Sequence, residues 1–181
     1  MISQQLIISG VGGQGILFIT RLLAETAIAA GLPVLTSETH GMAQRGGVVI
    51  SHLKVGSFTS PLVRPGQADG LLTLKAETIA LHRHFLRTGG WVTVNALSPP
   101  AETEDFPTVA IDADTIALRI DNPQAVNLIV LGRALAEQGR LFCSAEDVMA
   151  LIRNKLNGKP ALLESALAAF REGLDNGKGE L

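Results

Sequence analysis

Hydrophobic residues along the chain fall into short strand-like runs that alternate with longer helical runs. The clearest strand is 48–55, where side chains alternate between two faces, and the clearest helix is 16–30, which ends at Gly31 and Pro33. The strands that this pattern predicts are 5–9, 34–36, 48–55, 70–74, 91–95 and 109–112. The predicted helices are 16–30, 75–87, 123–138, 145–156 and 160–174.

Local signals mark several helix ends. Ser144 is a typical N-cap residue, and Asp147 three positions later comes near the pattern of a capping box. Pro160 suits the first turn of its helix, and Gly89-Gly90 would end the helix 75–87.

Strands that alternate with helices predict an α/β fold. We expect a single Rossmann-like domain with a mainly parallel sheet and helices on both faces. The domain should span residues 1–175, and the polar, glycine-containing tail 176–181 should be frayed.

Composition favours a protein of the cytoplasm with much buried surface. The chain has 181 residues, of which 46% are hydrophobic and 18% charged, and some of the apolar surface is expected to meet a partner subunit. No apolar run approaches the ~20 residues of a membrane span, and the N-terminus lacks the basic segment of a secretory signal. We therefore expect no membrane association.

Charge and metal-ligating residues exclude further classes of function. The net charge of −2, without a basic run, argues against a nucleic-acid partner. Cys143 is the only cysteine, so the chain alone supplies neither a disulfide nor the ligands of an iron–sulfur cluster. The four histidines show no zinc spacing, and no metal site is expected. We expect His82 and His84 to be solvated, and Cys143 and Trp91 to be packing residues.

A glycine-rich turn between the first strand and the first helix is the first candidate site. Its sequence is Gly10-Val11-Gly12-Gly13-Gln14-Gly15, a G-x-G-x-x-G pattern. In dinucleotide-binding folds the three glycines permit a tight turn, a close approach of the pyrophosphate and close packing of the helix on its strand. The helix N-terminus then offers free N–H groups to an anion.

The loop after the second strand is the second candidate site. It packs an acid, a histidine, a glutamine, an arginine and three glycines into the sequence Thr36-Ser37-Glu38-Thr39-His40-Gly41-Met42-Ala43-Gln44-Arg45-Gly46-Gly47. In an open parallel sheet such a loop lies at the edge where ligands bind. Glu38 could hold ribose hydroxyls of a nicotinamide cofactor, Arg45 a carboxylate or phosphate, and His40 could titrate near neutral pH. Alternatively, Glu38 and Arg45 pair locally and the glycines only shape a turn.

Taken together, the glycine turn and the run from Ser37 to Gly47 resemble the gamma-type subunits of the 2-oxoacid:acceptor oxidoreductase family. The His-Gly-Met-Ala-Gln-Arg-Gly-Gly run is most similar to the indolepyruvate ferredoxin oxidoreductase branch, whose corresponding subunit is called beta. Asn127-Leu128-Ile129-Val130-Leu131-Gly132, Lys159-Pro160 and Ala169-Phe170-Arg171-Glu172-Gly173 resemble later parts of the family, so the resemblance covers nearly the whole chain.

This resemblance implies an enzyme subunit that is inactive alone. Members of the family oxidatively decarboxylate a 2-oxoacid to an acyl-CoA and reduce ferredoxin. Thiamine diphosphate and iron–sulfur clusters are then carried by a catalytic partner subunit, and this chain lacks the Gly-Asp-Gly…Asn-Asn signature of thiamine sites. The resemblance also places coenzyme A near this subunit.

Site roles follow from the resemblance. The site residues are Gly10, Gly12, Gly13, Gln14 and Gly15. The N–H groups from Gly12 to Gly15 would form a cradle for a coenzyme A phosphate or contact a partner loop, with Gln14 hydrogen-bonded across the turn.

The loop residues Glu38, His40, Gly41, Gln44, Arg45, Gly46 and Gly47 would face the catalytic subunit, with no catalytic residue assigned. For Asn127, a structural hydrogen bond and a ligand contact both remain open. Two alternatives stay in view: an autonomous NAD-dependent dehydrogenase and a non-enzymatic nucleotide-binding module.

Overall fold

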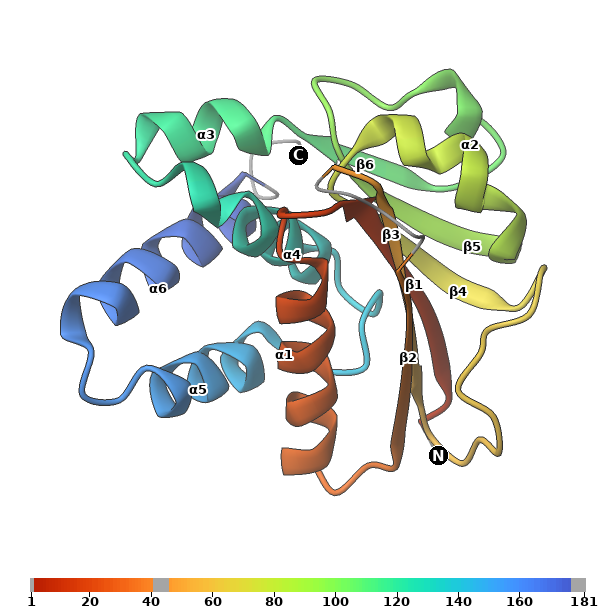
Figure 1. Cartoon of the computed structure of the whole chain (residues 1–181), viewed down its shortest axis with the longest axis horizontal. Coiled ribbons are helices and arrows are strands. Elements are labelled where there is room, and N and C mark those ends of the chain that lie inside the picture. The colour runs from red at the N-terminus through yellow and green to blue at the C-terminus, as the bar shows by residue number, and fades with distance from the viewer. Residues whose placement is uncertain (1, 41–45, 177–181) are drawn as a thin grey trace.

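The computed structural model describes residues 2–40 and 46–176, and its centre is a six-stranded sheet (Figure 1). The strands lie in the order β2-β3-β1-β4-β5-β6. Their bounds are β1 Gln4–Val11, β2 Val34–His40, β3 Val48–Val55, β4 Ala68–Thr73, β5 Leu86–Asn95 and β6 Thr108–Ile111.

The sheet is mainly parallel, as predicted, with one exception. β1, β4, β5 and β6 pair in parallel, whereas β3 is antiparallel to both of its neighbours, β1 and β2. The chain leaves β1 for the edge strand β2, returns through β3, and only then crosses to β4 on the other side of β1. The carboxyl end of β1 is therefore the point where the strand order changes direction, which is where ligands bind in open α/β sheets.

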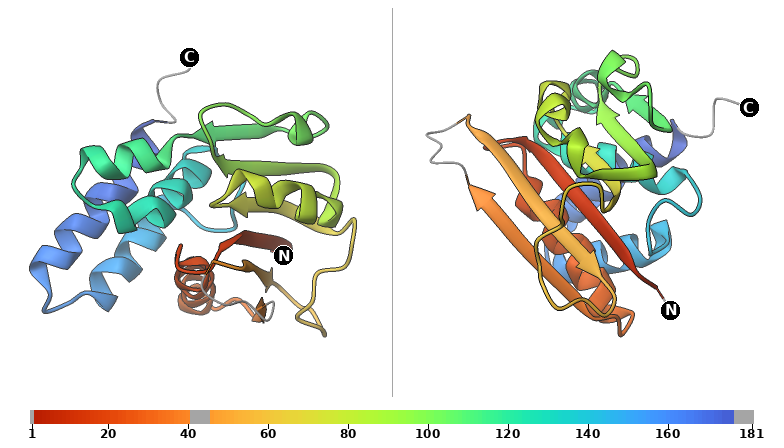
Figure 2. Two further views of the ribbon diagram at one scale, coloured as in Figure 1. Left: turned by 45° about the horizontal axis from the view of Figure 1, so that its top comes forward. Right: turned by 90° about the vertical axis from the view of Figure 1, so that its right-hand side faces the viewer.

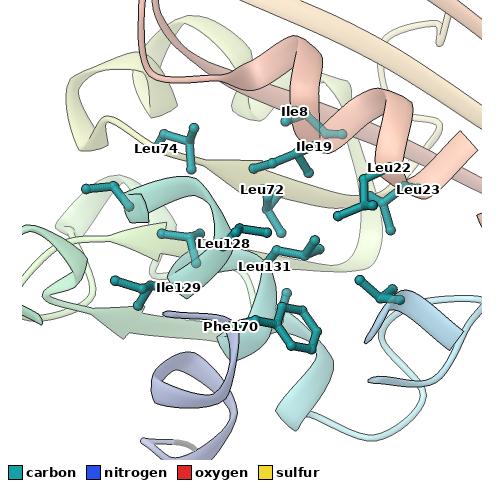
Figure 3. Close-up of a cluster of buried hydrophobic side chains, with 14 of the residues drawn as sticks. Ile8, Ile19, Leu22, Leu23, Leu72, Leu74, Leu128, Ile129, Leu131 and Phe170 are labelled. Carbon is teal, nitrogen blue, oxygen red and sulfur yellow. The ribbon is translucent and has the colours of Figure 1, made fainter. Parts of the chain in front are cut away.

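The longer helices cover one face of the sheet (Figures 1 and 2). They are α1 Ile16–Ala29, α3 Ala113–Arg119, α4 Val126–Ala136, α5 Ala145–Lys155 and α6 Pro160–Asp175. Ile19, Leu72, Leu131 and Phe170 meet in the larger core between these helices and the sheet (Figure 3). Burial of such side chains contributes roughly 1.5–3 kcal/mol each, so this face supplies most of the hydrophobic stabilisation.

Two glycines bring α4 and α6 into backbone contact. A Cβ on Gly132 would lie 2.2 Å from the carbonyl oxygen of Phe170, and a Cβ on Gly173 would lie 2.0 Å from that of Ile129. Larger residues at these positions would force the helices apart. The tight crossing fixes α4, whose N-terminus reaches the glycine turn.

The opposite face carries only short helical segments and a smaller core. Instead of the predicted helix 75–87, the structure has η1 Ala76–Thr78, α2 Ile79–His82 and η2 Arg83–Phe85. Residues 76–85 are helical, as predicted, but in three short segments; residues 86–90 already belong to β5, so the predicted end of this helix and its Gly89-Gly90 stop were wrong. The prediction of helices on both faces is confirmed, although the longer helices all lie on one face and only short helical segments lie on the other.

Other boundaries agree closely or reveal missed elements. The strand 48–55 is reproduced, and Ser144 with Asp147 forms a complete capping box at the start of α5. The helix α3 and the remaining 3₁₀ turns η3 Ala101–Thr103 and η4 Pro123–Ala125 were not predicted as such; α3 begins after Asp112, whose side chain accepts a hydrogen bond from Thr115 N. Among the described residues no helix is long and apolar enough to cross a membrane. Of the tail 176–181, Asn176 still caps α6, and 177–181 lie outside the described residues.

Two histidines lie in the smaller core. His52 accepts a hydrogen bond from Val63 N at 3.2 Å and packs edge-on against Phe85. The prediction that His82 is solvated was wrong, because its side chain is buried and its Nδ1 has no hydrogen-bond partner among the described residues. Burial, reinforced by the nearby His84 and His52, lowers the pKa of His82 from 6.5 to about 4.

Replacing Gly173 by alanine should destabilise the protein strongly. The added methyl group would collide with the Ile129 carbonyl of α4, and overpacking of this kind typically costs about 1–3 kcal/mol. Urea denaturation measures the change. Arg171→Ala, at an exposed position of the same helix, should stay within about 0.5 kcal/mol of the wild type. Equal midpoints for the two variants would contradict the close helix contact.

The buried His82 should make the fold sensitive to acid. Its pKa is lower in the folded than in the unfolded chain, so stability is complete above about pH 6.5 and is lost as the pH falls towards 4. The variant His82→Leu should show a shallower decline of the unfolding free energy in this window. His84→Leu, at an exposed neighbouring position, should change the decline less, because His84 only reinforces the effect of burial on His82. An unchanged slope in His82→Leu would show that another group causes the acid sensitivity.

Candidate functional site

The glycine turn joins the carboxyl end of β1 to the N-terminus of α1. Gly13 and Gly15 have φ values of +97° and +82°, a region that L-residues with side chains rarely adopt. Gly15 is the N-cap residue of α1 and therefore offers no side-chain cap. The turn is thus as tight as the sequence predicted, and it leaves the first N–H groups of α1 without a side-chain acceptor.

Gln14 holds this turn together. Its Oε1 accepts a hydrogen bond from Val11 N at 2.9 Å, and its Nε2 donates to the carbonyl of Leu74 at 3.0 Å. The predicted hydrogen bond across the turn is therefore confirmed. Gly10 lies inside β1, and its role is to make room: a Cβ there would lie 2.6 Å from Gln14 Oε1.

Gly15 provides close packing, but against a different element from the one predicted. A Cβ at this position would lie 2.1 Å from Nδ2 of Asn127 on α4. The third glycine of the pattern thus permits a helix–helix contact, whereas in dinucleotide-binding folds it permits a helix–strand contact.

The two candidate sites meet at Gly12. Its N–H donates a hydrogen bond to the carbonyl of Gly47 at 2.9 Å, and a Cβ on Gly12 would lie 3.5 Å from Gly46 N. The backbone of the β2–β3 hairpin therefore occupies the side of the turn that, in a dinucleotide site, faces the pyrophosphate. Sequence reasoning proposed both motifs, but their direct contact needs the antiparallel β3.

The structure describes only some of the predicted loop residues. Glu38 lies within β2, and His40 is the last residue of that strand. Gly46, with φ +98°, and Gly47 lead into β3. The remaining predicted loop residues, Gly41, Gln44 and Arg45, lie outside the described residues.

The position of Glu38 does not suit a nicotinamide cofactor. In the sheet register Glu38 is opposite Ser51, and Ser51 is opposite Ile8. Glu38 is therefore two strand spacings, about 10 Å, from β1, and level with its middle. A ribose-binding acid is expected at the carboxyl end of a strand directly beside β1.

Asn95 is a site residue that the sequence reasoning missed. Its Nδ2 donates to the Leu74 carbonyl at 3.3 Å and to Asp114 Oδ2 at 2.8 Å, and its Oδ1 accepts from Ala113 N at 2.9 Å. The Leu74 carbonyl thus receives amides from both Gln14 and Asn95. The sequence feature that could have identified it is an asparagine at the end of a predicted apolar strand.

A hollow of about 350 Å³ opens beside the turn, lined by Gly12, Gly13, Gly15, Ile16, Leu17 and Val49. The N–H groups of Gly13, Gly15, Ile16 and Leu17 make no hydrogen bond to a described residue, and no acid lies in the first turn of α1. Such an arrangement can bind an anion.

The described residues that line the hollow include no group for acid–base or nucleophilic chemistry. No three histidine, cysteine, aspartate or glutamate side chains gather into a metal site in the described part of the chain. Cys143, half-buried before α5, is not an activated thiol, since burial raises its pKa to about 12.

Comparisons with known proteins identify the family. The sequence pattern of the pyruvate ferredoxin/flavodoxin oxidoreductase family matches residues 5–176. The chain is 31% identical to the indolepyruvate oxidoreductase subunit IorB of Archaeoglobus fulgidus, over 93% of this chain and 92% of that protein. It is also 31% identical to IorB of Pyrococcus horikoshii, over 96% and 95% of the two chains.

Solved structures share the fold. The gamma subunit of a keto/oxoacid ferredoxin oxidoreductase from Geobacter sulfurreducens has a TM-score of 0.75 and 25% identity, over 97% of this chain and 98% of that one. A 2-oxoglutarate:ferredoxin oxidoreductase from Magnetococcus marinus, with 2-oxoglutarate, coenzyme A and succinyl-CoA bound, has a TM-score of 0.82 and 21% identity. The match covers all of this chain and 32% of that one. The chain therefore belongs to the pyruvate ferredoxin/flavodoxin oxidoreductase family and is a subunit of a 2-oxoacid:ferredoxin oxidoreductase.

Proposed function

We propose that this chain is the subunit without thiamine and without clusters in an enzyme that converts an aryl-pyruvate, such as indolepyruvate, to an acyl-CoA and reduces ferredoxin. The indolepyruvate assignment is supported by the similarity to two archaeal IorB subunits along nearly their whole length. The subunit itself serves assembly and the binding of coenzyme A.

Thiamine diphosphate and the iron–sulfur clusters belong, in this proposal, to a catalytic partner subunit. The single cysteine of this chain cannot ligate a cluster, since these clusters need several thiolates. Among the described residues, the lining of the hollow beside the glycine turn also offers no acid or base for the decarboxylation.

The β2–β3 hairpin loop is our candidate for the contact with that partner. Its ends lie at the same sheet edge as the glycine turn, and Gly47 touches Gly12 directly. The chain covers 35% of the ketoisovalerate oxidoreductase subunit VorA of Methanothermobacter marburgensis but 92% of the A. fulgidus IorB. Related segments thus occur both alone and within longer chains, which supports a surface adapted to other domains of the enzyme. Residues 38–47, including Arg45, would form this contact.

The purified chain should be inactive until it is combined with its catalytic partner. Mixed with the thiamine- and cluster-bearing subunit, it should support reduction of ferredoxin that depends on indolepyruvate and coenzyme A, measured by absorbance. The partner alone and this chain alone are the controls. Hydride transfer to NAD by the isolated chain would contradict the proposal, as would full activity of the partner without this chain.

The observation that carries the coenzyme A assignment is the row of open N–H groups at the start of α1. Four of them have no acceptor among the described residues, and the adjoining hollow is lined by small and apolar residues. A phosphate group would satisfy these donors and the positive end of the helix dipole together.

Leu17→Glu should weaken coenzyme A binding more than Leu17→Gln, which removes the same partly buried leucine side chain from the edge of the core. The new carboxylate would stand in the first turn of α1, where it favours the helix but repels an anion. In the complex we expect the KM for coenzyme A to rise about tenfold, with an unchanged KM for the 2-oxoacid. Leu17→Gln has nearly the same shape without the charge and should have a much smaller effect. Equal KM values for the Glu and Gln variants would contradict an anion at this position.

A further inference from the structure

One edge of the sheet ends in a strand that no described part of the chain covers. β2 is the last strand in the order β2-β3-β1-β4-β5-β6, and no described segment lies along its outer edge, the side that faces away from β3 (Figure 2). We propose that an extended segment of the catalytic partner subunit pairs with this outer edge and adds a strand to the six-stranded sheet. This inference rests on the proposed function and adds a defined contact surface to it.

The first step is the direction of the backbone hydrogen-bonding groups of β2. Gly56 N donates to the carbonyl of Pro33 at 2.8 Å, and these two residues continue the register in which Val34 is opposite Val55. In an antiparallel pair, residues that bond to the neighbouring strand alternate with residues whose N–H and C=O groups point away from it. Val34 and Thr36 therefore turn both of their backbone groups towards the outer edge.

The second step is that these groups have no partner in the described part of the chain. No hydrogen bond joins the N–H or the C=O of Val34 or Thr36 to a described residue on this side of β2. The side chain of Thr36 is exposed, so the edge is accessible to another chain at this residue. A row of unpaired N–H and C=O groups is a template for a further strand.

The third step is the absence from β2 of the features that protect sheet edges. Proteins commonly shorten an edge strand, interrupt it with a bulge, or place lysine or proline in it. The opposite edge strand, β6, has four residues. In contrast, β2 has seven residues in unbroken register with β3, and its sequence contains neither lysine nor proline. Its exposed residues Thr36 and Thr39 are β-branched, which favours pairing with a further strand.

The fourth step is the identity of the added strand. β2 leads directly into the hairpin loop that we propose as the contact with the catalytic subunit, so the outer edge and this loop form one continuous surface. In the VorA subunit of M. marburgensis, the segment similar to this chain is part of a longer polypeptide, of which it makes up 35%. Both observations favour a segment of the catalytic partner over a second copy of this chain.

The first test replaces Thr36 by proline. Proline has no N–H, and its ring blocks the approach of another strand, yet it is tolerated in edge strands where the N–H faces solvent. Thr36→Pro should therefore leave the urea midpoint of the isolated chain close to that of the wild type. It should raise the Kd for the catalytic subunit at least about tenfold, because backbone hydrogen bonds between the chains are lost.

Thr36→Val is the matched control. It keeps the N–H group and the branched shape of threonine, so its Kd for the catalytic subunit should stay within twofold of the wild type. An unchanged Kd in Thr36→Pro would overturn the inference. A loss of affinity in Thr36→Val as large as that in Thr36→Pro would also overturn it, because the side chain would then make the contact instead of the backbone.

Hydrogen exchange on the wild-type protein tests the pairing without any substitution. In the isolated chain the amides of Val34 and Thr36 should exchange rapidly, whereas those of Leu35 and Ser37 should exchange slowly because they pair with β3. In the assembled enzyme the amides of Val34 and Thr36 should exchange at least about tenfold more slowly. Unchanged exchange of these two amides in an active complex would overturn the inference and leave the proposed function intact.

Two further outcomes would contradict different parts of the proposal. Protection of the Thr36 amide that grows with the concentration of the isolated chain, together with a dimer in sedimentation, would show that a second copy occupies the edge. This result would overturn the assignment to the catalytic subunit. If the chain and the catalytic subunit do not associate at all, the proposed function fails and this inference fails with it.

Discussion

The carbonyl oxygen of Leu74, at the end of β4, organises the carboxyl edge of the sheet. It accepts hydrogen bonds from the amides of Gln14 and Asn95, while Leu74 N donates to the carbonyl of Ser9 in β1. Through Gln14 this oxygen sets the glycine turn, and through Asn95 it reaches the start of α3. Buried amide networks of this kind are rigid only when every hydrogen-bonding group in them has a partner. The shape of the turn therefore depends on Leu74, Gln14 and Asn95 together.

The glycine pattern keeps its geometry here while its contacts differ from those of a nucleotide-binding turn. Gly10 makes room for a glutamine, Gly12 binds the β2–β3 hairpin, and Gly15 receives an asparagine from α4. Each difference follows from a neighbour that a dinucleotide-binding sheet does not place there. The same local sequence therefore supports a different site, because function depends on what packs around a motif.

Much of the fold could be predicted from the sequence, because its signals are local. The alternation over 48–55 and the capping box at Ser144 depend on neighbouring residues only, and both were located correctly. The predicted helix 75–87 ends earlier in the structure, because Leu86 pairs with Ala68 in β4, a tertiary contact that overrides the helical pattern at this end. The contacts of Gly12 with Gly47 and of Gly15 with Asn127 could not be predicted, since they depend on the antiparallel insertion of β3 and on where α4 crosses α1.

The hydrogen bond between Gly12 and Gly47 ties the start of β3 to the glycine turn. A displacement of Gly47 would remove the acceptor of the Gly12 N–H and alter the turn that presents the other donors. If the hairpin loop meets a partner subunit and the turn binds an anion, as proposed, docking and ligand binding become thermodynamically linked. Linkage is reciprocal, so a partner that tightens the ligand must itself be held more firmly, by the same factor, once the ligand is present.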